Sequence, residues 1–147
     1  MSRKLPSTPA STSQPATPTH PDLITLLAVS PNREDRRSLQ SILDAPGWSI
    51  RWAKDLREAE QLLRQSPSLV ICDSELPDGS WQEVLRAAET LDMAPPVIVA
   101  TKNADQRFWA EVLNLGGFDV LLKPFEISEV SQVLGMAARQ QHSLAFA

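Results

Sequence analysis

The sequence predicts a three-layer α/β fold, with helices on both faces of a five-stranded parallel sheet. Four short, mainly apolar runs and one segment of alternating polar and apolar residues, at 49–53, alternate with five segments whose apolar residues recur at helical spacing. Strands of a parallel sheet are buried on both faces and therefore appear as such runs. Regular alternation of strands and helices is the pattern of an α/β fold. With 147 residues, the chain is expected to form one domain.

Residues 1–21 differ in composition from the rest of the chain. Eight Ser or Thr and five Pro account for 13 of these 21 positions. A segment of this kind cannot bury enough apolar surface to fold, and it lacks the apolar stretch of a secretory signal. We therefore predict a disordered tail at residues 1–21, a folded domain at residues 22–140 and a frayed end at residues 141–147.

The first half of the domain contains three predicted strands and two predicted helices. Ser30 and Pro31 predict a helix start, with the serine as N-cap and the proline as first helical residue. Asp55 with Glu58 predicts the start of the second helix. Pro-Gly and Ser-Pro pairs mark the two helix ends. The strands are expected at residues 23–29, 49–53 and 69–73, and the helices at residues 30–44 and 55–65.

The second half repeats this alternation. Ser80 with Glu83 predicts a capping box for a third helix that ends before the prolines at 95–96. Two glycines at 116–117 predict the end of a fourth helix. Strands are expected at residues 97–100 and 120–122, and the last two helices at residues 105–115 and 128–139.

Composition and charge exclude several classes of protein. No apolar run reaches the ~18 residues of a membrane span. The lone cysteine, Cys72, excludes an internal disulfide, lies in an apolar run and is expected to be a small core residue in a reducing compartment. All 18 acidic residues but only 12 of the 14 basic residues follow residue 21. An acidic domain of this kind argues against direct nucleic-acid binding.

Three polar side chains follow predicted strands at their carboxyl ends: Asp73, Thr101 and Lys123. Ligand sites of parallel sheets lie in the crevice beyond these ends, so we expect the three to meet. A carboxylate can act as a nucleophile toward phosphorus, and a hydroxyl and an ammonium can hold phosphoryl oxygens. The structural alternative is a Lys123–Asp73 ion pair with Thr101 as a capping residue, and spacing alone leaves both interpretations open.

These motifs resemble the response-regulator receiver domain of two-component signalling, the chemotaxis-receiver type. The resemblance covers residues 22–140. It rests on Val-Ile-Cys-Asp at 70–73, Leu-Pro-Asp-Gly at 76–79, Gly-Gly-Phe-Asp at 116–119 and Lys-Pro-Phe at 123–125. It implies a flavodoxin-like (βα)5 fold with strand order 2-1-3-4-5 and a cis Lys123–Pro124 peptide bond.

The resemblance also implies a cytoplasmic phospho-acceptor module in a phosphorelay. Such a module is not an enzyme beyond weak self-phosphorylation and dephosphorylation. Asp73 would accept the phosphoryl group from a histidine kinase or phosphotransfer protein, and Thr101 and Lys123 would bind that group. Since no output domain is evident after residue 140, we expect a stand-alone receiver that docks on a downstream protein, without membrane or nucleic-acid contact. The family commonly docks through the fourth helix, fifth strand and fifth helix, which would place Trp109 at a partner surface; the alternative is a Trp109 half-buried against the next helix.

One departure from the family pattern concerns the metal. Receivers keep two acidic residues directly after the first strand to hold Mg²⁺, and here these positions are Ser30 and Pro31. The expected ligands reduce to Asp73, the backbone carbonyl of Glu75 and water, with Asn32 as a neutral substitute. We therefore expect a weak or absent Mg²⁺ site.

A second departure concerns the switch aromatic of the family, which is replaced by Val120. Together with the missing acidic pair, it favours an alternative function: a pseudo-receiver, a protein-binding module without Mg²⁺-dependent phosphorylation. With fewer carboxylates nearby, we expect Lys123 to lower the pKa of Asp73. Asp73 and Glu75 also resemble the Asp-x-Asp of haloacid-dehalogenase-type phosphatases, but the chain lacks room for a cap domain and lacks the further acidic cluster.

Overall fold

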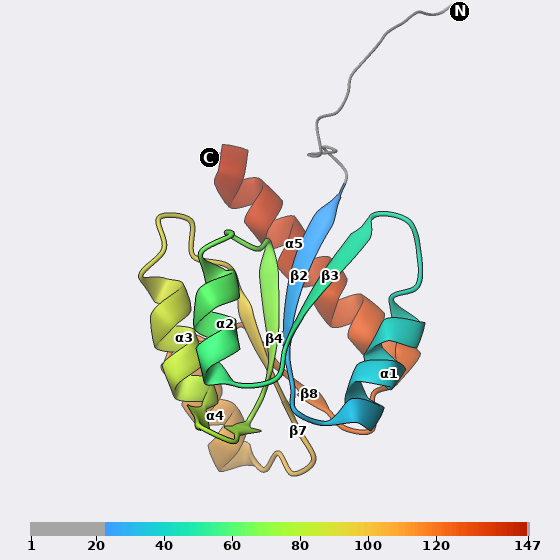
Figure 1. Cartoon of the computed structure of the whole chain (residues 1–147), viewed down its shortest axis with the longest axis vertical. Coiled ribbons are helices and arrows are strands. Elements are labelled where there is room, and N and C mark those ends of the chain that lie inside the picture. The colour runs from blue at the N-terminus through green and yellow to red at the C-terminus, as the bar shows by residue number, and fades with distance from the viewer. Residues whose placement is uncertain (1–22, 147) are drawn as a thin grey trace, which may run out of the picture.

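The computed structural model describes residues 23–146, and the side chains of residues 23–140. A five-stranded parallel sheet lies between two layers of helices (Figure 1). The sheet strands are β2 Ile24–Val29, β3 Trp48–Ala53, β4 Leu69–Asp73, β7 Val97–Thr101 and β8 Asp119–Leu122. The helices are α1 Arg33–Ile42, α2 Leu56–Leu63, α3 Trp81–Glu89, α4 Gln106–Asn114 and α5 Ile127–Phe146. The predicted tail at residues 1–21 lies outside the described residues, and fraying of residues 141–147 stays a prediction.

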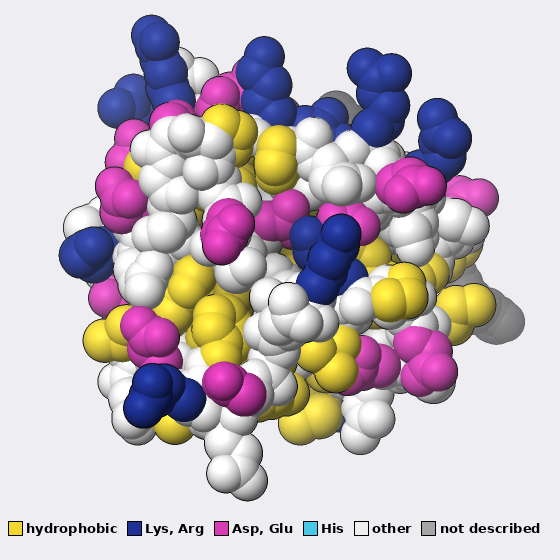
Figure 2. Space-filling view, turned by 90° about the horizontal axis from the view of Figure 1, so that it is seen from below, with side chains coloured by type: hydrophobic (Ala, Val, Ile, Leu, Met, Phe, Trp, Pro, Cys, Tyr) yellow, Lys and Arg dark blue, Asp and Glu magenta, His cyan; other side chains and the backbone are white. Residues whose placement is uncertain are grey.

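The strand order is β3-β2-β4-β7-β8, which confirms the predicted order 2-1-3-4-5. Asp73 is level with Ala100, and Thr101 is level with Leu122. Asp73, Thr101 and Lys123 therefore end or follow three adjacent strands at the same edge of the sheet. This edge lies at the bottom of Figure 1, and Figure 2 views the molecule from that side.

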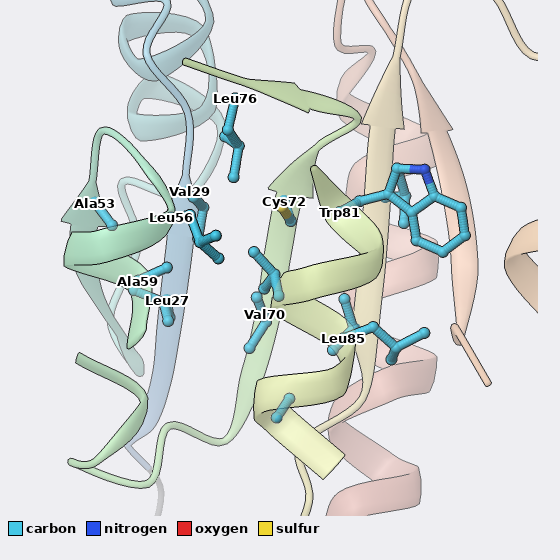
Figure 3. Packing of buried hydrophobic residues seen from close by; sticks show 14 of the residues in the cluster. Leu27, Val29, Ala53, Leu56, Ala59, Val70, Cys72, Leu76, Trp81 and Leu85 are labelled. Atoms are coloured by element: carbon cyan, nitrogen blue, oxygen red, sulfur yellow. The ribbon is translucent and has the colours of Figure 1, made fainter. Parts of the chain in front are cut away.

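The two faces of the sheet form two apolar clusters. One face packs against α2, α3 and α4, with Leu27, Val70, Cys72 and Trp81 among its members (Figure 3). The other face packs against α1 and α5, with Leu26, Ile71 and Ile98 among its members. Every residue of β4 and β7 is buried, as the continuous apolar runs predict, and each fully buried Leu, Ile or Val contributes about 1.5–3 kcal/mol. None of the described helices is long and apolar enough to cross a membrane.

Cys72 is a core residue, as predicted. Its side chain is fully buried in the cluster that faces α2 and α3. Burial, followed by the neighbouring Asp73 charge, raises the pKa of the Cys72 thiol. The thiol stays protonated and is not a nucleophile.

Of the three helix starts predicted from capping residues, the first is wrong and the other two are right. The N-cap of α1 is Asn32, whose Oδ1 accepts a 2.9 Å hydrogen bond from the Asp35 amide, so Ser30 and Pro31 precede the helix. Ser80 is the N-cap residue of α3 as predicted, but its side chain makes no capping hydrogen bond, so the predicted capping box with Glu83 does not form. Asp55 caps α2 as predicted, with its Oδ1 accepting from the Glu58 amide at 2.9 Å.

Candidate functional site

Asp73 is the last residue of β4, and its carboxylate is held by two donors. The Ser30 hydroxyl, just after β2, donates to Oδ2 of Asp73 at 2.8 Å. The Lys123 ammonium lies 2.8 Å from Oδ1. Only 8% of the Asp73 side chain is exposed. Each carboxylate oxygen therefore has a partner, as a buried charge requires.

Lys123 follows β8 and links three parts of the fold. Its amide donates to the Thr101 carbonyl at 2.9 Å, which fixes the backbone beside β7. Its Nζ lies 2.8 Å from Asp73 and 2.7 Å from Oδ2 of Asp35, a residue in the first turn of α1. The peptide bond to Pro124 is cis, as predicted. One ammonium is thus shared by two carboxylates from different elements.

The expected lowering of the Asp73 pKa is wrong. Burial raises the pKa of Asp73, although the hydrogen bonds from Lys123 and Ser30 act in the opposite direction. The Asp35 charge adds to the rise. The expectation considered the pairing with Lys123 and not the loss of water around the carboxylate, which is the larger effect here.

The pKa of Lys123 is raised although its ammonium is largely buried. Burial alone would lower the pKa of Lys123, but the hydrogen bonds to Asp35 and Asp73 outweigh it and raise that pKa. Lys123 therefore stays charged throughout the physiological range. A fixed positive charge beside Asp73 suits the binding of an anion.

Thr101 ends β7 and lies at the rim of an open pocket of about 330 Å³. Its Oγ1 accepts a hydrogen bond from the Ser74 hydroxyl at 3.3 Å. The pocket is lined by Pro31, Asn32, Asp73, Ser74, Glu75, Thr101, Lys102, Asn103 and Lys123. The structure thus brings the three predicted site residues to one pocket, which is lined by a carboxylate, a hydroxyl and an ammonium.

The residues at this pocket do not fit the Mg²⁺ site that the family pattern implies. Ser30 is buried and uses its hydroxyl hydrogen on Asp73, and Pro31 offers no side-chain ligand. The side-chain oxygen of Asn32 caps α1. Within the described residues, no three His, Cys, Asp or Glu side chains gather where they could hold a metal ion. Asp73 is the one carboxylate of the expected set, and Glu75 lies on the pocket wall.

Asp35 is the site residue that sequence reasoning missed. It stands five residues after Ser30, inside a helix, where no receiver motif singles it out. Asn32 caps α1, so Asp35 occupies the third helical position, and the first turn of α1 begins at the same edge of the sheet as Asp73. An acidic residue in the first turn of the helix that follows β2 is the signal that could have found it.

The Leu-Pro-Asp-Gly motif forms a short hairpin of β5 Glu75–Leu76 and β6 Gly79–Ser80, which the sequence analysis missed. Asp78 at its turn accepts hydrogen bonds from the amides of Leu56 at 2.8 Å and Arg57 at 3.1 Å, at the start of α2. A Cβ at Gly79 would lie 2.7 Å from a methyl carbon of Leu56. The motif therefore ties the loop after Asp73 to the start of α2.

The sequence profile of the response regulator receiver domain matches residues 26–135. The virulence transcriptional regulatory protein PhoP of Salmonella typhimurium (strain 14028s / SGSC 2262) is 32% identical over 124 residues, which cover 84% of this chain and 55% of that protein. The transcriptional regulatory protein PhoP of Escherichia coli (strain K12) is 30% identical over 121 residues, with 82% and 54% covered. The chain spans about half the length of these curated relatives.

Solved structures share the fold. The signal receiver domain of an HD domain-containing protein from Pseudomonas fluorescens Pf-5 has a TM-score of 0.77 at 26% identity, covering 90% of this chain and 98% of that one. The chemotaxis response regulator CheY4 of Vibrio cholerae has a TM-score of 0.70 at 21% identity, covering 78% and 98%. From these matches and the pocket at the sheet edge, the chain belongs to the response regulator receiver domain family of two-component signalling.

Proposed function

We propose that this receiver accepts a phosphoryl group on Asp73 and passes the signal on by docking to another protein. Receiver domains are phospho-acceptor signalling modules rather than enzymes, and they pair with histidine kinases. The observation that carries the proposal is the position of Asp73. Asp73 lines an open pocket together with Thr101, and its carboxylate lies 2.8 Å from the Lys123 ammonium.

The chemistry follows from these positions. An oxygen of the ionised Asp73 carboxylate attacks the phosphorus of the donor, and the bond between phosphorus and the leaving group breaks, which leaves an acyl phosphate on Asp73. The phosphoryl oxygens carry negative charge throughout, and Lys123 is a donor with a full positive charge beside them. The Thr101 hydroxyl supplies a second donor. A histidine kinase or a phosphotransfer protein is the donor in this proposal.

Docking to a protein, and not to nucleic acid, also belongs to the proposal. Acidic and basic side chains are interspersed on the face that carries the pocket (Figure 2), whereas a nucleic-acid site shows a continuous basic surface. Leu122 at the end of β8, directly before the pocket residue Lys123, is exposed by 39%, and Ile127 at the start of α5 is exposed by 67%. Apolar side chains at this exposure suit the centre of a protein interface.

A second candidate function is a pseudo-receiver, a module that binds its partner without being phosphorylated. The specific observation in its favour is the lack of fit to Mg²⁺. Phosphoryl transfer relies on the metal to neutralise developing charge, and Ser30 and Pro31 supply no carboxylate. Under this candidate, the Asp73–Lys123 pair is a structural ion pair that keeps the pocket closed to chemistry.

The two candidates separate in one experiment. The protein is incubated with acetyl phosphate, with Mg²⁺ or with EDTA, and its intact mass is measured. We expect the mass of one added phosphoryl group in the wild type and none in Asp73→Asn. The matched control is Asp44→Asn, which removes an exposed carboxylate outside the pocket and should keep the modification. No added mass under any condition, including with a histidine kinase as donor, would favour the pseudo-receiver.

The stand-alone arrangement and the cytoplasmic location are further parts of the proposal. An antibody against residues 23–140 would report the size of the native protein and the cell fraction that contains it. We expect a band near the mass of this chain, 16.2 kDa, in the cytoplasmic fraction. A band of about twice that size would show an attached output region, as in regulators of the length of the curated relatives.

A further inference from the structure

We propose that Asp35 is a positioning residue that holds the Lys123 ammonium against Asp73, and that this internal cation replaces Mg²⁺ as the charge partner of Asp73. The pocket then keeps its charge balance without a divalent ion. The inference concerns the folded pocket alone. It can be tested whether or not Asp73 is phosphorylated.

The geometry around the ammonium carries the first step. Lys123 Nζ lies 2.7 Å from Asp35 and 2.8 Å from Asp73, and the three side chains are exposed by 10%, 16% and 8%. Lys123 and Asp35 are 88 residues apart in sequence. Charged pairs at this distance interact more strongly when water is largely excluded. The ammonium is therefore held between two carboxylates and not free to leave Asp73.

The second step concerns the support of Asp35. Its amide donates to Asn32 Oδ1 at 2.9 Å, which fixes the first turn of α1. The next residue, Arg36, donates from Nε to the Ser30 carbonyl at 2.9 Å and lies over the Trp52 ring at 5.7 Å. These contacts tie the start of α1 to the end of β2 and to β3. Asp35 therefore reaches Lys123 from an anchored backbone.

The third step concerns a competing metal ion. Both carboxylates are within hydrogen-bond distance of one nitrogen, so a divalent ion between them would have to displace the ammonium or lie beside it. A second cation beside an ammonium is repelled. Mg²⁺ also needs near-octahedral oxygen ligands, and Ser30 and Pro31 do not supply carboxylates. The wild-type pocket should therefore gain nothing from Mg²⁺.

The main test removes the internal cation. Lys123→Met leaves Asp35 and Asp73 facing each other, and Mg²⁺ should then bind between them and stabilise the fold. We expect the melting temperature of Lys123→Met to rise by about 3–6 °C at a Mg²⁺ concentration about ten times its dissociation constant. The wild type should show no rise beyond that in NaCl of equal ionic strength. Lys102→Met is the matched control, since it removes an exposed lysine from the same pocket, and it should behave as the wild type.

A double variant, Lys123→Met with Asp35→Asn, should lose the Mg²⁺ response and so assign the second ligand to Asp35. A Mg²⁺-specific rise in the wild type that disappears in Asp73→Asn would overturn the proposal. A folded Lys123→Met variant whose melting temperature does not rise with Mg²⁺ would also overturn it.

If Lys123→Met does not fold, NMR of the wild type and Asp35→Asn decides. A paired ammonium exchanges its hydrogens slowly, so the Lys123 side-chain signal should be visible in ¹⁵N spectra of the wild type. Asp35→Asn should abolish this signal. The control is Glu34→Gln, which removes one charge from the same helical turn at an exposed side chain and should retain the signal. A signal that persists in Asp35→Asn would show that Asp35 does not position Lys123.

Discussion

The Ser30 hydroxyl donates a 2.8 Å hydrogen bond to Oδ2 of Asp73, although the two residues are 43 positions apart. The Ser30 hydroxyl oxygen in turn accepts a hydrogen bond from the Asn32 amide at 3.1 Å. Both Ser30 and Asp73 are buried. Ser30 therefore joins the end of β2 to the end of β4, and the bond takes the place of a helix cap that the sequence predicts for this serine.

Ser30→Ala should destabilise the protein, because it leaves an oxygen of a buried carboxylate without its donor. We expect a loss of about 1.5–3 kcal/mol in the free energy of unfolding, the usual contribution of a hydrogen bond to a charged group. Urea denaturation measures it. Ser128→Ala is the control, since the Ser128 hydroxyl bonds to the Glu126 carboxylate on the surface. An equal effect of the two substitutions would contradict the role of Ser30.

Asp73→Asn should change the pH dependence of stability. Because the folded pKa of Asp73 is raised, the folded state holds this proton to a higher pH than the unfolded chain does. Stability therefore falls as pH rises from the unfolded pKa of about 3.9 through the folded pKa. Asn does not titrate. The unfolding free energy of Asp73→Asn should therefore increase relative to that of the wild type as pH rises across this interval. Urea denaturation at a series of pH values measures it, and movement in favour of the wild type would refute the raised pKa.

Asp78→Asn should loosen the hairpin that follows Asp73. The hydrogen bond from the Leu56 amide, with that from the Arg57 amide, lowers the pKa of Asp78. The two amides use different carboxylate oxygens, and Asn has only one side-chain oxygen that can accept. A lowered carboxylate pKa stabilises the fold above the unfolded pKa of about 3.9, and this contribution fades as pH falls through the folded pKa. The melting temperature should drop at pH 7, and the gap to the wild type should close in acid. A difference in melting temperature that stays constant with pH would argue against these two hydrogen bonds of Asp78. Asp44→Asn, at an exposed aspartate, is the control.

Replacing both Ser30 and Pro31 with Asp should create a Mg²⁺ site. The change adds two carboxylates beside Asp73 while Asn32 keeps the cap of α1. Like-charge repulsion should lower stability without metal, and Mg²⁺ should recover it by binding the folded state. The melting temperature should rise with Mg²⁺ in this variant and not in one with Asn at both positions. An equal rise in the wild type would mean that Glu75, Asn32 or water already completes a site.

Trp109→Ala tests the partner surface. Trp109 is half-buried and packs against the cluster of α2 and α3, as does its neighbour Phe108. The substitution should lower stability by about 3 kcal/mol, because a large aromatic side chain leaves the cluster, and should leave partner binding intact. Ile127→Ala, at an exposed apolar residue, should leave stability unchanged and weaken partner binding. Unchanged stability with lost binding in Trp109→Ala would instead place the ring at the interface.

The sequence by itself determined the fold class, the strand order through the family resemblance, and three residues of the pocket. Continuous apolar runs predicted strands that are buried on both faces, because a strand covered by helices on both sides is apolar at every position. Asp73, Thr101 and Lys123 each follow such a run, and parallel strands bring their carboxyl ends to one edge. These features depend on residues that are close together in the sequence, so they can be predicted from it.

Only the tertiary structure decided the partners of Asp73. Ser30 could cap a helix or bond to a carboxylate 43 residues away, and the packing of β2 beside β4 selects the second. The ion pair between Asp35 and Lys123 depends on how α1 packs against the edge of the sheet, and no local sequence pattern predicts that packing. The direction of the Asp73 pKa depends on how much water the folded chain excludes, and that is a property of the whole packing and not of any residue pair.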